Sequence, residues 1–148
     1  MFRKVLYPTD FSDVAKIAIN YLKQLKDAGT EEVVILYVVD TRNLHMPNIY
    51  DAFPDLSQIG EKQEILAEEK ARQIVNELSN AGIKTTIRIE KGIPFKEILR
   101  VEKEENVSLI IIGSHGTSNV QEMLLGSVSE KVVRKAEKPV LVVKRQPD

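Results

Sequence analysis

Residues 109–129 read LIIIGSHGTSNVQEMLLGSVS, and this stretch predicts the class of fold. Residues 109–112 are leucine or isoleucine, which is typical of a buried strand. A loop with the spacing G-x2-G-x9-G-S follows, and a helical period begins at its end. The residues of that spacing are Gly113, Gly116, Gly126 and Ser127. A strand, a glycine loop and a helix start can place backbone N–H groups around a phosphate. The stretch therefore predicts an α/β fold and a site for a nucleotide or another phosphate.

Strand-like and helical segments alternate along the rest of the chain. Apolar runs predict strands over residues 3–8, 32–39, 83–90, 108–112 and 139–144. Helical spacing of apolar residues predicts helices over residues 13–28, 58–81, 92–105 and 127–136. This order predicts an open, mostly parallel sheet with helices on both faces. The strand over 83–90 alternates apolar and polar residues, which indicates one exposed face, as at a sheet edge.

The predicted helix over residues 58–81 has one apolar stripe, which we interpret as core or interface. Its members are Ile65, Ala67, Ala71, Ile74, Val75 and Leu78. Residues 40–57 before it show no period and contain Pro47 and Pro54. We expect a loop there, and loops of this length in a compact domain are often functional.

Length and composition narrow the class of protein. The chain has 148 residues, which predicts a single domain over residues 1–148 with a sizeable core. Its net charge of −1 gives no basic field, so we expect neither nucleic acid nor an anionic membrane as a partner. The absence of cysteine excludes disulfides, thiol catalysis and cysteine metal ligands. No signal peptide or membrane-spanning run is visible, so we expect a cytoplasmic protein.

In an open α/β sheet, the ligand site lies beyond the carboxyl ends of the strands, where the strand order reverses. If the first strand is central, its end at Pro8, Thr9 and Asp10 lies beside Gly113. The end of the second strand, at residues 37–40, is then the next neighbour. Segments far apart in the sequence would thus face one pocket.

The glycine loop supplies groups that suit a phosphate. Gly113 and Gly116 suit a backbone that either approaches a ligand closely or takes a positive φ. Hydroxyl and amide donors are present at Ser114, Thr117, Ser118 and Asn119. Ser127 has an alternative role, because Ser127 and Glu130 match the capping box S-x-x-E, in which the serine caps its own helix. In either case the N–H groups of the helix start remain available to a ligand.

Asp10 is the strongest acidic candidate. Its carboxylate could accept a hydrogen bond from a ribose or nucleobase, or hold a metal ion or its water; alternatively, Asp10 or Ser12 caps the first helix. His115 could donate to a phosphate, but a lone histidine is more often positional than catalytic. We expect no protein metal centre, because no carboxylates cluster with the two histidines. No nucleophile–base pair is visible, so no catalytic residue is assigned.

No lysine or arginine occurs between Gly113 and Glu130, so the loop differs from the GxxxxGK[ST] type. A triphosphate would be held by backbone dipoles, hydroxyl groups and a divalent cation. The cationic side chains that usually stabilise phosphoryl transfer are missing from this stretch. The loop therefore favours a binding protein over a hydrolase.

Three motifs together resemble the universal stress protein family. They are PTDFS at residues 8–12, GSHGTSN followed by LLGSVSEKV in the glycine loop and its helix, and KPVLVVK at residues 138–144. The resemblance spans the whole chain, including the order of its elements. In this family the pattern G-x2-G-x9-G-[ST], which the chain fits without gaps, marks the ATP-binding branch.

The resemblance implies an adenine nucleotide α-hydrolase-like, Rossmann-like fold with five parallel strands in the order 3-2-1-4-5. It implies bound ATP, with Mg²⁺ or Mn²⁺ accompanying the phosphates. The family's acidic residue near the ribose and base corresponds to Asp10, and its adenine-contacting backbone corresponds to Val38, with Val39 beside it. The candidate nucleotide-binding residues are Pro8, Thr9, Asp10, Val38, Val39, Gly113, Ser114, His115, Gly116, Thr117, Ser118, Asn119, Gly126, Ser127, Val128 and Ser129.

The resemblance also implies a homodimer formed through the last strand, at Val140, Leu141, Val142 and Val143. An apolar edge strand needs a cover, which agrees with this expectation. We expect an ATP-binding regulatory or stress-response module that acts through a protein partner and turns over little nucleotide. The alternatives are a slow ATPase whose partner supplies the missing charge, and a dimeric scaffold that carries nucleotide incidentally.

Overall fold

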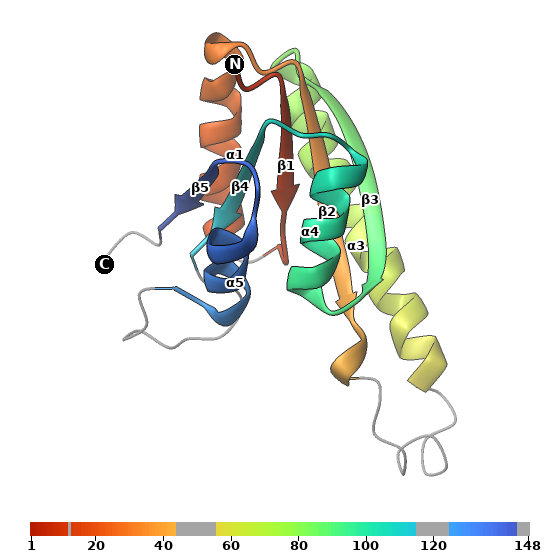
Figure 1. Cartoon of the computed structure of the whole chain (residues 1–148). Helices are drawn as coiled ribbons and strands as arrows, with labels where there is room; N and C mark the ends of the chain where they lie inside the picture. Colours follow the sequence, from red (N-terminus) through yellow and green to blue (C-terminus); the bar gives the residue numbers. More distant parts are fainter. Residues whose placement is uncertain (12, 44–55, 115–124, 145–148) are drawn as a thin grey trace.

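A five-stranded sheet forms the centre of the molecule in the computed structural model, which describes residues 1–11, 13–43, 56–114 and 125–144 (Figure 1). All neighbouring strands are parallel, and their order is β3-β2-β1-β4-β5. The strands are β1 (Lys4–Pro8), β2 (Glu32–Asp40), β3 (Lys84–Gly92), β4 (Leu109–Gly113) and β5 (Val140–Val143). The predicted fold class and strand order are confirmed, and β1 is the central strand between β2 and β4.

Helices cover both faces of the sheet. They are α1 (Asp13–Leu25), α3 (Leu56–Asn80), α4 (Pro94–Glu104) and α5 (Ser127–Lys135), with short 3-10 turns η1 (Lys26–Ala28) and η2 (Thr41–Asn43). The residues packed against the sheet place α1 and α3 on one face and α4 and α5 on the other, as Figure 1 also shows.

The central strands are buried on both sides because alternate residues enter two separate cores. Val5 and Tyr7 of β1 pack with Leu22 of α1 and Leu78 of α3. Leu6, which lies between them in sequence, enters the opposite core with residues of α4 and α5. Burial of such a side chain stabilises the fold by roughly 1.5–3 kcal/mol. The continuous apolar runs of the sequence are therefore what places these strands at the centre.

The bounds of the predicted elements agree with the structure to within a few residues. The largest difference is in α1, which ends at Leu25, where the chain continues as the 3-10 turn η1. Gly29 follows with φ 104°, a left-handed conformation that glycine adopts without strain. β2 extends to Asp40 and is followed by η2, so the predicted 40–57 loop begins with regular structure. Residues 44–55 of that loop lie outside the described residues.

The apolar stripe on α3 is confirmed except at its first member. Ala67, Ala71, Ile74 and Leu78 are buried, but Ile65 is 57% exposed, so it is not part of the core, and its alternative role at an interface stays a prediction. Glu64 beside it forms an ion pair with Lys91, one residue before the end of β3. Figure 1 shows the first turns of α3 running beyond the end of β2. Ile65 comes two residues before the buried Ala67, which places it roughly 160° around the helix from the stripe, on the solvent side.

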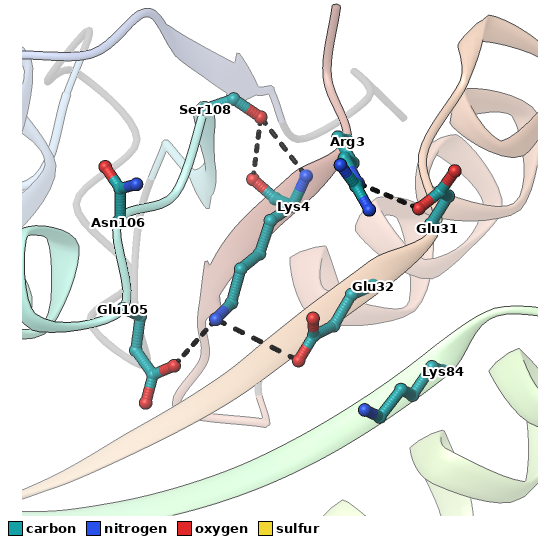
Figure 2. Close-up of a pocket in the computed structure, with 8 residues that line it drawn as sticks. All are labelled: Arg3, Lys4, Glu31, Glu32, Lys84, Glu105, Asn106 and Ser108. Atoms are coloured by element: carbon teal, nitrogen blue, oxygen red, sulfur yellow. Dashed lines mark hydrogen bonds and ion pairs between the residues drawn. The ribbon is translucent and has the colours of Figure 1, made fainter.

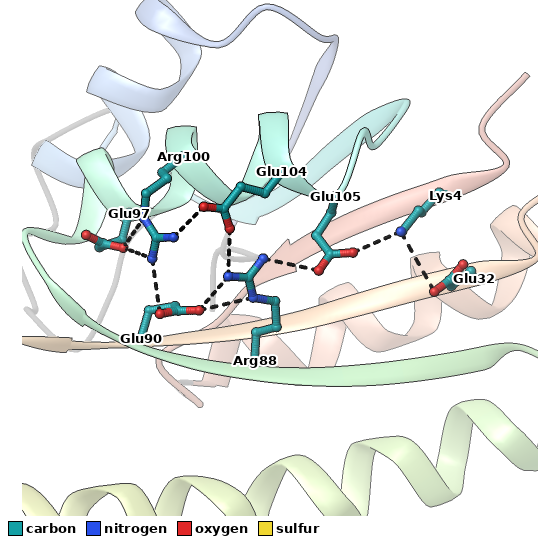
Figure 3. Close-up of polar contacts among 8 residues, drawn as sticks. All are labelled: Lys4, Glu32, Arg88, Glu90, Glu97, Arg100, Glu104 and Glu105. Atoms are coloured by element: carbon teal, nitrogen blue, oxygen red, sulfur yellow. Dashed lines mark hydrogen bonds and ion pairs between the residues drawn. The ribbon is translucent and has the colours of Figure 1, made fainter.

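An ion-pair network joins the edge strand β3 to α4 (Figure 3). Arg88 of β3 contacts Glu90 at 2.6 Å, Glu104 at 2.8 Å and Glu105 at 3.1 Å. Arg100 of α4 binds Glu90 at 3.1 Å and also contacts Glu97 and Glu104. Charged side chains of this kind protect a sheet edge from pairing with another strand.

Candidate nucleotide site

The structure brings the predicted strand ends together at one edge of the sheet. Pro8 at the end of β1 pairs with Leu36 of β2, and the next N–H, that of Thr9, donates to the Leu36 carbonyl oxygen at 2.9 Å. On the other side β1 pairs with β4, which ends at Gly113. Val38 and Val39 follow Leu36 on β2. The predicted neighbours at the carboxyl ends of β1, β2 and β4 are thus confirmed as neighbours, while their roles stay predictions.

Hydrogen bonds hold the two described ends of the glycine loop against each other. The Ser114 N–H donates to the Val143 carbonyl oxygen at 2.8 Å, and the Gly126 N–H donates to the Ser114 carbonyl oxygen at 2.6 Å. The hydroxyl group of Ser129 donates to the Gly113 carbonyl oxygen at 2.6 Å. The first turn of α5 therefore lies directly beside the end of β4, as a phosphate site of this type requires.

The residue at the N-cap of α5 provides no side-chain cap. It is Gly126, and among the described residues no side chain is recorded as capping the helix start. Ser127 is the first helical residue and is exposed, so the alternative that Ser127 and Glu130 form a capping box is wrong. Without a cap, the first N–H groups of α5 have no partner inside the helix. These donors lie at the edge of the sheet where the predicted ligand would bind.

The described glycines of the loop do not need glycine for their backbone conformation. Gly126 has φ −69° and ψ 165°, an extended conformation that other residues adopt. Gly113 lies in β4 and has no positive φ, unlike Gly29, Gly82 and Gly92. Of the two predicted reasons for these glycines, a positive φ is therefore wrong at Gly113. The other predicted reason for glycine, close approach of a ligand to the backbone, stays a prediction.

The turn after β1 contains an unusual backbone conformation at Phe11. Phe11 has φ 62°, in the left-handed region. Its N–H donates to Thr9 Oγ1 at 2.9 Å, and its ring stacks on Tyr37 of β2 with the ring centres 5.4 Å apart. Asp10, at the apex of this turn, is exposed. Sequence reasoning missed Phe11 and Tyr37, because nothing in a single sequence marks a left-handed phenylalanine.

Two tyrosines lie near the Asp10 carboxylate. Burial raises the pKa of Tyr7 to about 12, a hydrogen bond with the Thr9 side chain acts in the opposite direction, and the negative charge of Asp10 raises the pKa further. Burial also raises the pKa of Tyr37, and again the Asp10 charge adds to the shift. The Asp10 carboxylate is thus close enough to both phenol groups to disfavour their ionisation.

Several predicted site residues lie outside the described residues. They are His115, Gly116, Thr117, Ser118 and Asn119 of the loop. Ser12, the alternative cap of the first helix, lies outside as well. Within the part of the chain that the structure describes, no group of three or more histidine, aspartate or glutamate side chains could hold a metal ion. Among the described helices, none is long and apolar enough to cross a membrane.

A separate hollow of about 510 Å³ lies at the amino ends of the strands, opposite the candidate site (Figure 2). Most of its charged side chains form ion pairs with one another: Arg3 contacts Glu31 at 2.9 Å, and Lys4 contacts Glu105 at 2.9 Å and Glu32 at 4.0 Å. Carboxylates there would repel a phosphate. The hollow is therefore not the predicted nucleotide site.

The chain is similar to known proteins along its whole length. The chain matches the universal stress protein family over residues 1–144. It is 40% identical to universal stress protein MJ0577 of Methanocaldococcus jannaschii, over 99% of this chain and 97% of that protein. It is 32% identical to universal stress protein YxiE of Bacillus subtilis, over 97% of this chain and 100% of that protein.

Solved structures show the same relationship. The structure of MJ0577 matches with a TM-score of 0.90 and 41% identity, over 100% of this chain and 99% of that chain. Universal stress protein UspA from Lactobacillus plantarum matches with a TM-score of 0.85 and 27% identity, over 96% and 97% of the two chains. Fold, coverage and identity agree along the whole length, so this chain belongs to the universal stress protein family.

Proposed function

We propose that this protein binds ATP at the carboxyl edge of its sheet and acts as a nucleotide-dependent regulatory or stress-response module. The observation that carries the proposal is the uncapped start of α5, held beside the end of β4 by the bond from the Gly126 N–H to the Ser114 carbonyl oxygen. A helix start whose first N–H groups have no partner inside the helix favours an anion. The extended φ of Gly126 adds support, because glycine there leaves space that the backbone itself does not need.

The remaining parts of the nucleotide are assigned to the neighbouring strands. The phosphates bind the start of α5 at Ser127 and Val128 together with the glycine loop. The ribose and base lie toward Asp10 and toward the backbone of Val38, at the ends of β1 and β2. Mg²⁺ or Mn²⁺ accompanies the phosphates and offsets their charge, since no cationic side chain occurs between Gly113 and Glu130.

Two solved structures of the same fold hold adenine nucleotides. One is a universal stress protein in complex with cAMP, with a TM-score of 0.64 and 23% identity over 97% of each chain. The other is the universal stress protein from Archaeoglobus fulgidus in complex with dAMP, with a TM-score of 0.69 and 19% identity, over 97% and 100% of the chains. At these identities the likeness concerns the fold alone. It supports the class of ligand, and the choice of ATP rests on the glycine pattern.

Binding rather than hydrolysis is the activity that the residues favour. The sequence from Gly113 to Glu130 lacks the lysine or arginine that stabilises charge in phosphoryl transfer. The runner-up is a slow ATPase that obtains a cation from a partner protein. The two differ in the fate of bound ATP, which stays intact in the first and appears as ADP in the second.

We further propose that the protein forms a homodimer through β5. This strand has only β4 as a neighbour in the described sheet. Leu141 of β5 and Val133 of α5 are 39% and 43% exposed, which leaves apolar surface along this edge. A second copy of the chain would cover both the apolar side chains and the open edge.

The glycine positions allow a matched test of the nucleotide site. Gly126→Val should weaken ATP binding at least tenfold in titration calorimetry with Mg²⁺, while the protein stays folded, because the φ of Gly126 suits valine and a poorer N-cap residue costs only about 1 kcal/mol. Gly29→Ala is the control: its left-handed φ of 104° should cost about 1 kcal/mol of stability without changing the affinity. Unchanged ATP affinity in Gly126→Val would show that the phosphate assignment is wrong.

A further inference from the structure

We propose that Phe11 is a positioning residue for the nucleotide site: its ring, stacked on Tyr37, holds the Thr9–Phe11 turn so that Asp10 is presented in one orientation. This inference rests on the proposed function, because it takes Asp10 as the acidic group that meets the nucleotide. It adds a residue that does not itself touch the ligand.

The backbone of Phe11 is in a conformation that a phenylalanine rarely adopts. Its φ of 62° brings Cβ close to the following carbonyl group, which is unfavourable for a bulky side chain such as phenylalanine. Such conformations persist only where surrounding contacts hold them, and they concentrate at functional sites. Among the described residues, Asn106 is the other non-glycine with positive φ, and asparagine tolerates that region well.

Three contacts hold Phe11 in place. Its ring stacks on Tyr37 with 5.4 Å between the ring centres and 25° between the planes. The Lys70 ammonium of α3 lies 5.8 Å from the centre of the same ring. The ring also packs against the core beneath α1 and α3. The side chain is thus anchored in the core, and the backbone follows it.

The other end of the turn is anchored to the sheet. The Thr9 N–H donates to the Leu36 carbonyl oxygen at 2.9 Å, which continues the pairing of β1 with β2. Thr9 Oγ1 accepts the N–H of Phe11 at 2.9 Å and closes the turn across Asp10. Asp10 therefore lies between two anchored residues, while its own side chain is exposed. A carboxylate that is oriented before binding loses less entropy when the ligand arrives.

The test is a double-mutant cycle on ATP affinity, measured by calorimetry with Mg²⁺ on the full chain. Phe11→Ala should weaken binding about tenfold, the effect of one side chain that must be ordered on binding. In an Asp10→Ala background the same change should have no further effect, because Phe11 acts through Asp10. Tyr37→Leu removes the stacking ring and keeps apolar volume, so it should weaken binding in the same direction if Phe11→Ala does not fold.

Phe2→Ala is the matched control. Phe2 packs against the same core as Phe11 but lies before the opposite end of β1. This change should lower the melting temperature and leave ATP affinity unchanged, which separates positioning from a general loss of stability.

The outcomes separate the two proposals. If the unchanged protein does not bind ATP, the proposed function is wrong and this inference falls with it. If ATP binds and Asp10→Ala weakens binding, but Phe11→Ala and Tyr37→Leu do not, only this inference is overturned. Equal losses from Phe11→Ala with and without Asp10 would also overturn it, since Phe11 would then act by another route.

Discussion

The hydroxyl group of Ser129 donates a hydrogen bond to the carbonyl oxygen of Gly113, with 2.6 Å between the two oxygens. Ser129 lies in the first turn of α5 and is 5% exposed, and Gly113 is the last residue of β4. This bond links the strand before the glycine loop to the helix after it. The two described ends of the glycine loop therefore lie at one place, where the core holds them.

Substitutions at Ser129 and Ser127 should have different effects, the first on the stability of the fold and the second on ATP binding. Ser129→Ala should lower the free energy of unfolding by about 1 kcal/mol, because it removes a donor to the partly buried carbonyl oxygen of Gly113. Ser127→Ala, at an exposed position, should change stability by less than about 0.5 kcal/mol and weaken ATP binding. Chemical denaturation and calorimetry of both variants check this. Equal stability losses in the two variants would contradict the roles assigned to them.

Tyr7 should make the fold sensitive to alkaline pH. Its pKa is raised from 10.0 to about 12 in the folded protein, chiefly by burial. The stabilisation is thus complete below pH 10 and is lost as the pH rises through about 12, in total about 3 kcal/mol. Tyr7→Phe should show a smaller loss of unfolding free energy over this range, measured by denaturation at each pH. An identical loss in both proteins would refute the assignment.

The Arg88 network should contribute salt-dependent stability. Arg88→Gln leaves Glu90, Glu104 and Glu105 close together without their shared cation, so it should lower the free energy of unfolding by about 1 kcal/mol at low ionic strength. High salt should reduce this difference because it screens the partly exposed charges. Arg134→Gln, which breaks one exposed pair with Glu130, is the control and should have a smaller effect.

The same network has a pH signature. Hydrogen bonds from Arg88 and Lys4 lower the pKa of Glu104 and Glu105, respectively, below their ordinary value. Their stabilisation is present above that ordinary value and is lost as the pH falls through the lowered pKa values. The difference between Arg88→Gln and the unchanged protein should therefore shrink in acid. A difference that grows in acid would contradict this account.

The proposed dimer can be tested at Leu141. Leu141→Asp places a charge in the β5 interface and should convert a dimer to a monomer in sedimentation experiments. Leu66→Asp is the matched control, because Leu66 is 55% exposed on α3, away from β5. A protein that stays dimeric in Leu141→Asp, or that dissociates in Leu66→Asp, would point to another interface.

The fold was predictable because burial dominates it. The apolar runs over β1, β2 and β4 can be buried only if both faces of the sheet are covered. Helices that alternate with parallel strands provide this cover. Ile65 was assigned to the apolar stripe although, at 100° per residue, it lies roughly 160° around the helix from Ala67. Its 57% exposure therefore agrees with a strict reading of the helical period.

The position of the candidate site was predictable only for residues that belong to a recognisable sequence pattern. The glycine spacing and strand ends located Gly113, Gly126 and Asp10 at one edge. Local pattern was misleading at Ser127, where S-x-x-E suggested a cap, because the helix begins one residue earlier than the box requires and Gly126 takes the N-cap position. The left-handed Phe11 and the bond from Ser129 to Gly113 depend on contacts between distant elements, which no local pattern shows.

The most direct test of the central claim is the state of the nucleotide that the protein retains. Nucleotide-free protein is incubated with ATP and Mg²⁺, free nucleotide is removed, and the retained ATP and ADP are quantified after denaturation. We predict nearly equimolar retention, with the nucleotide still ATP after prolonged incubation. If no nucleotide is retained, the proposal that the protein binds ATP is contradicted. If ATP is converted to ADP well above the rate without protein, the proposal that the protein binds ATP without hydrolysing it is contradicted.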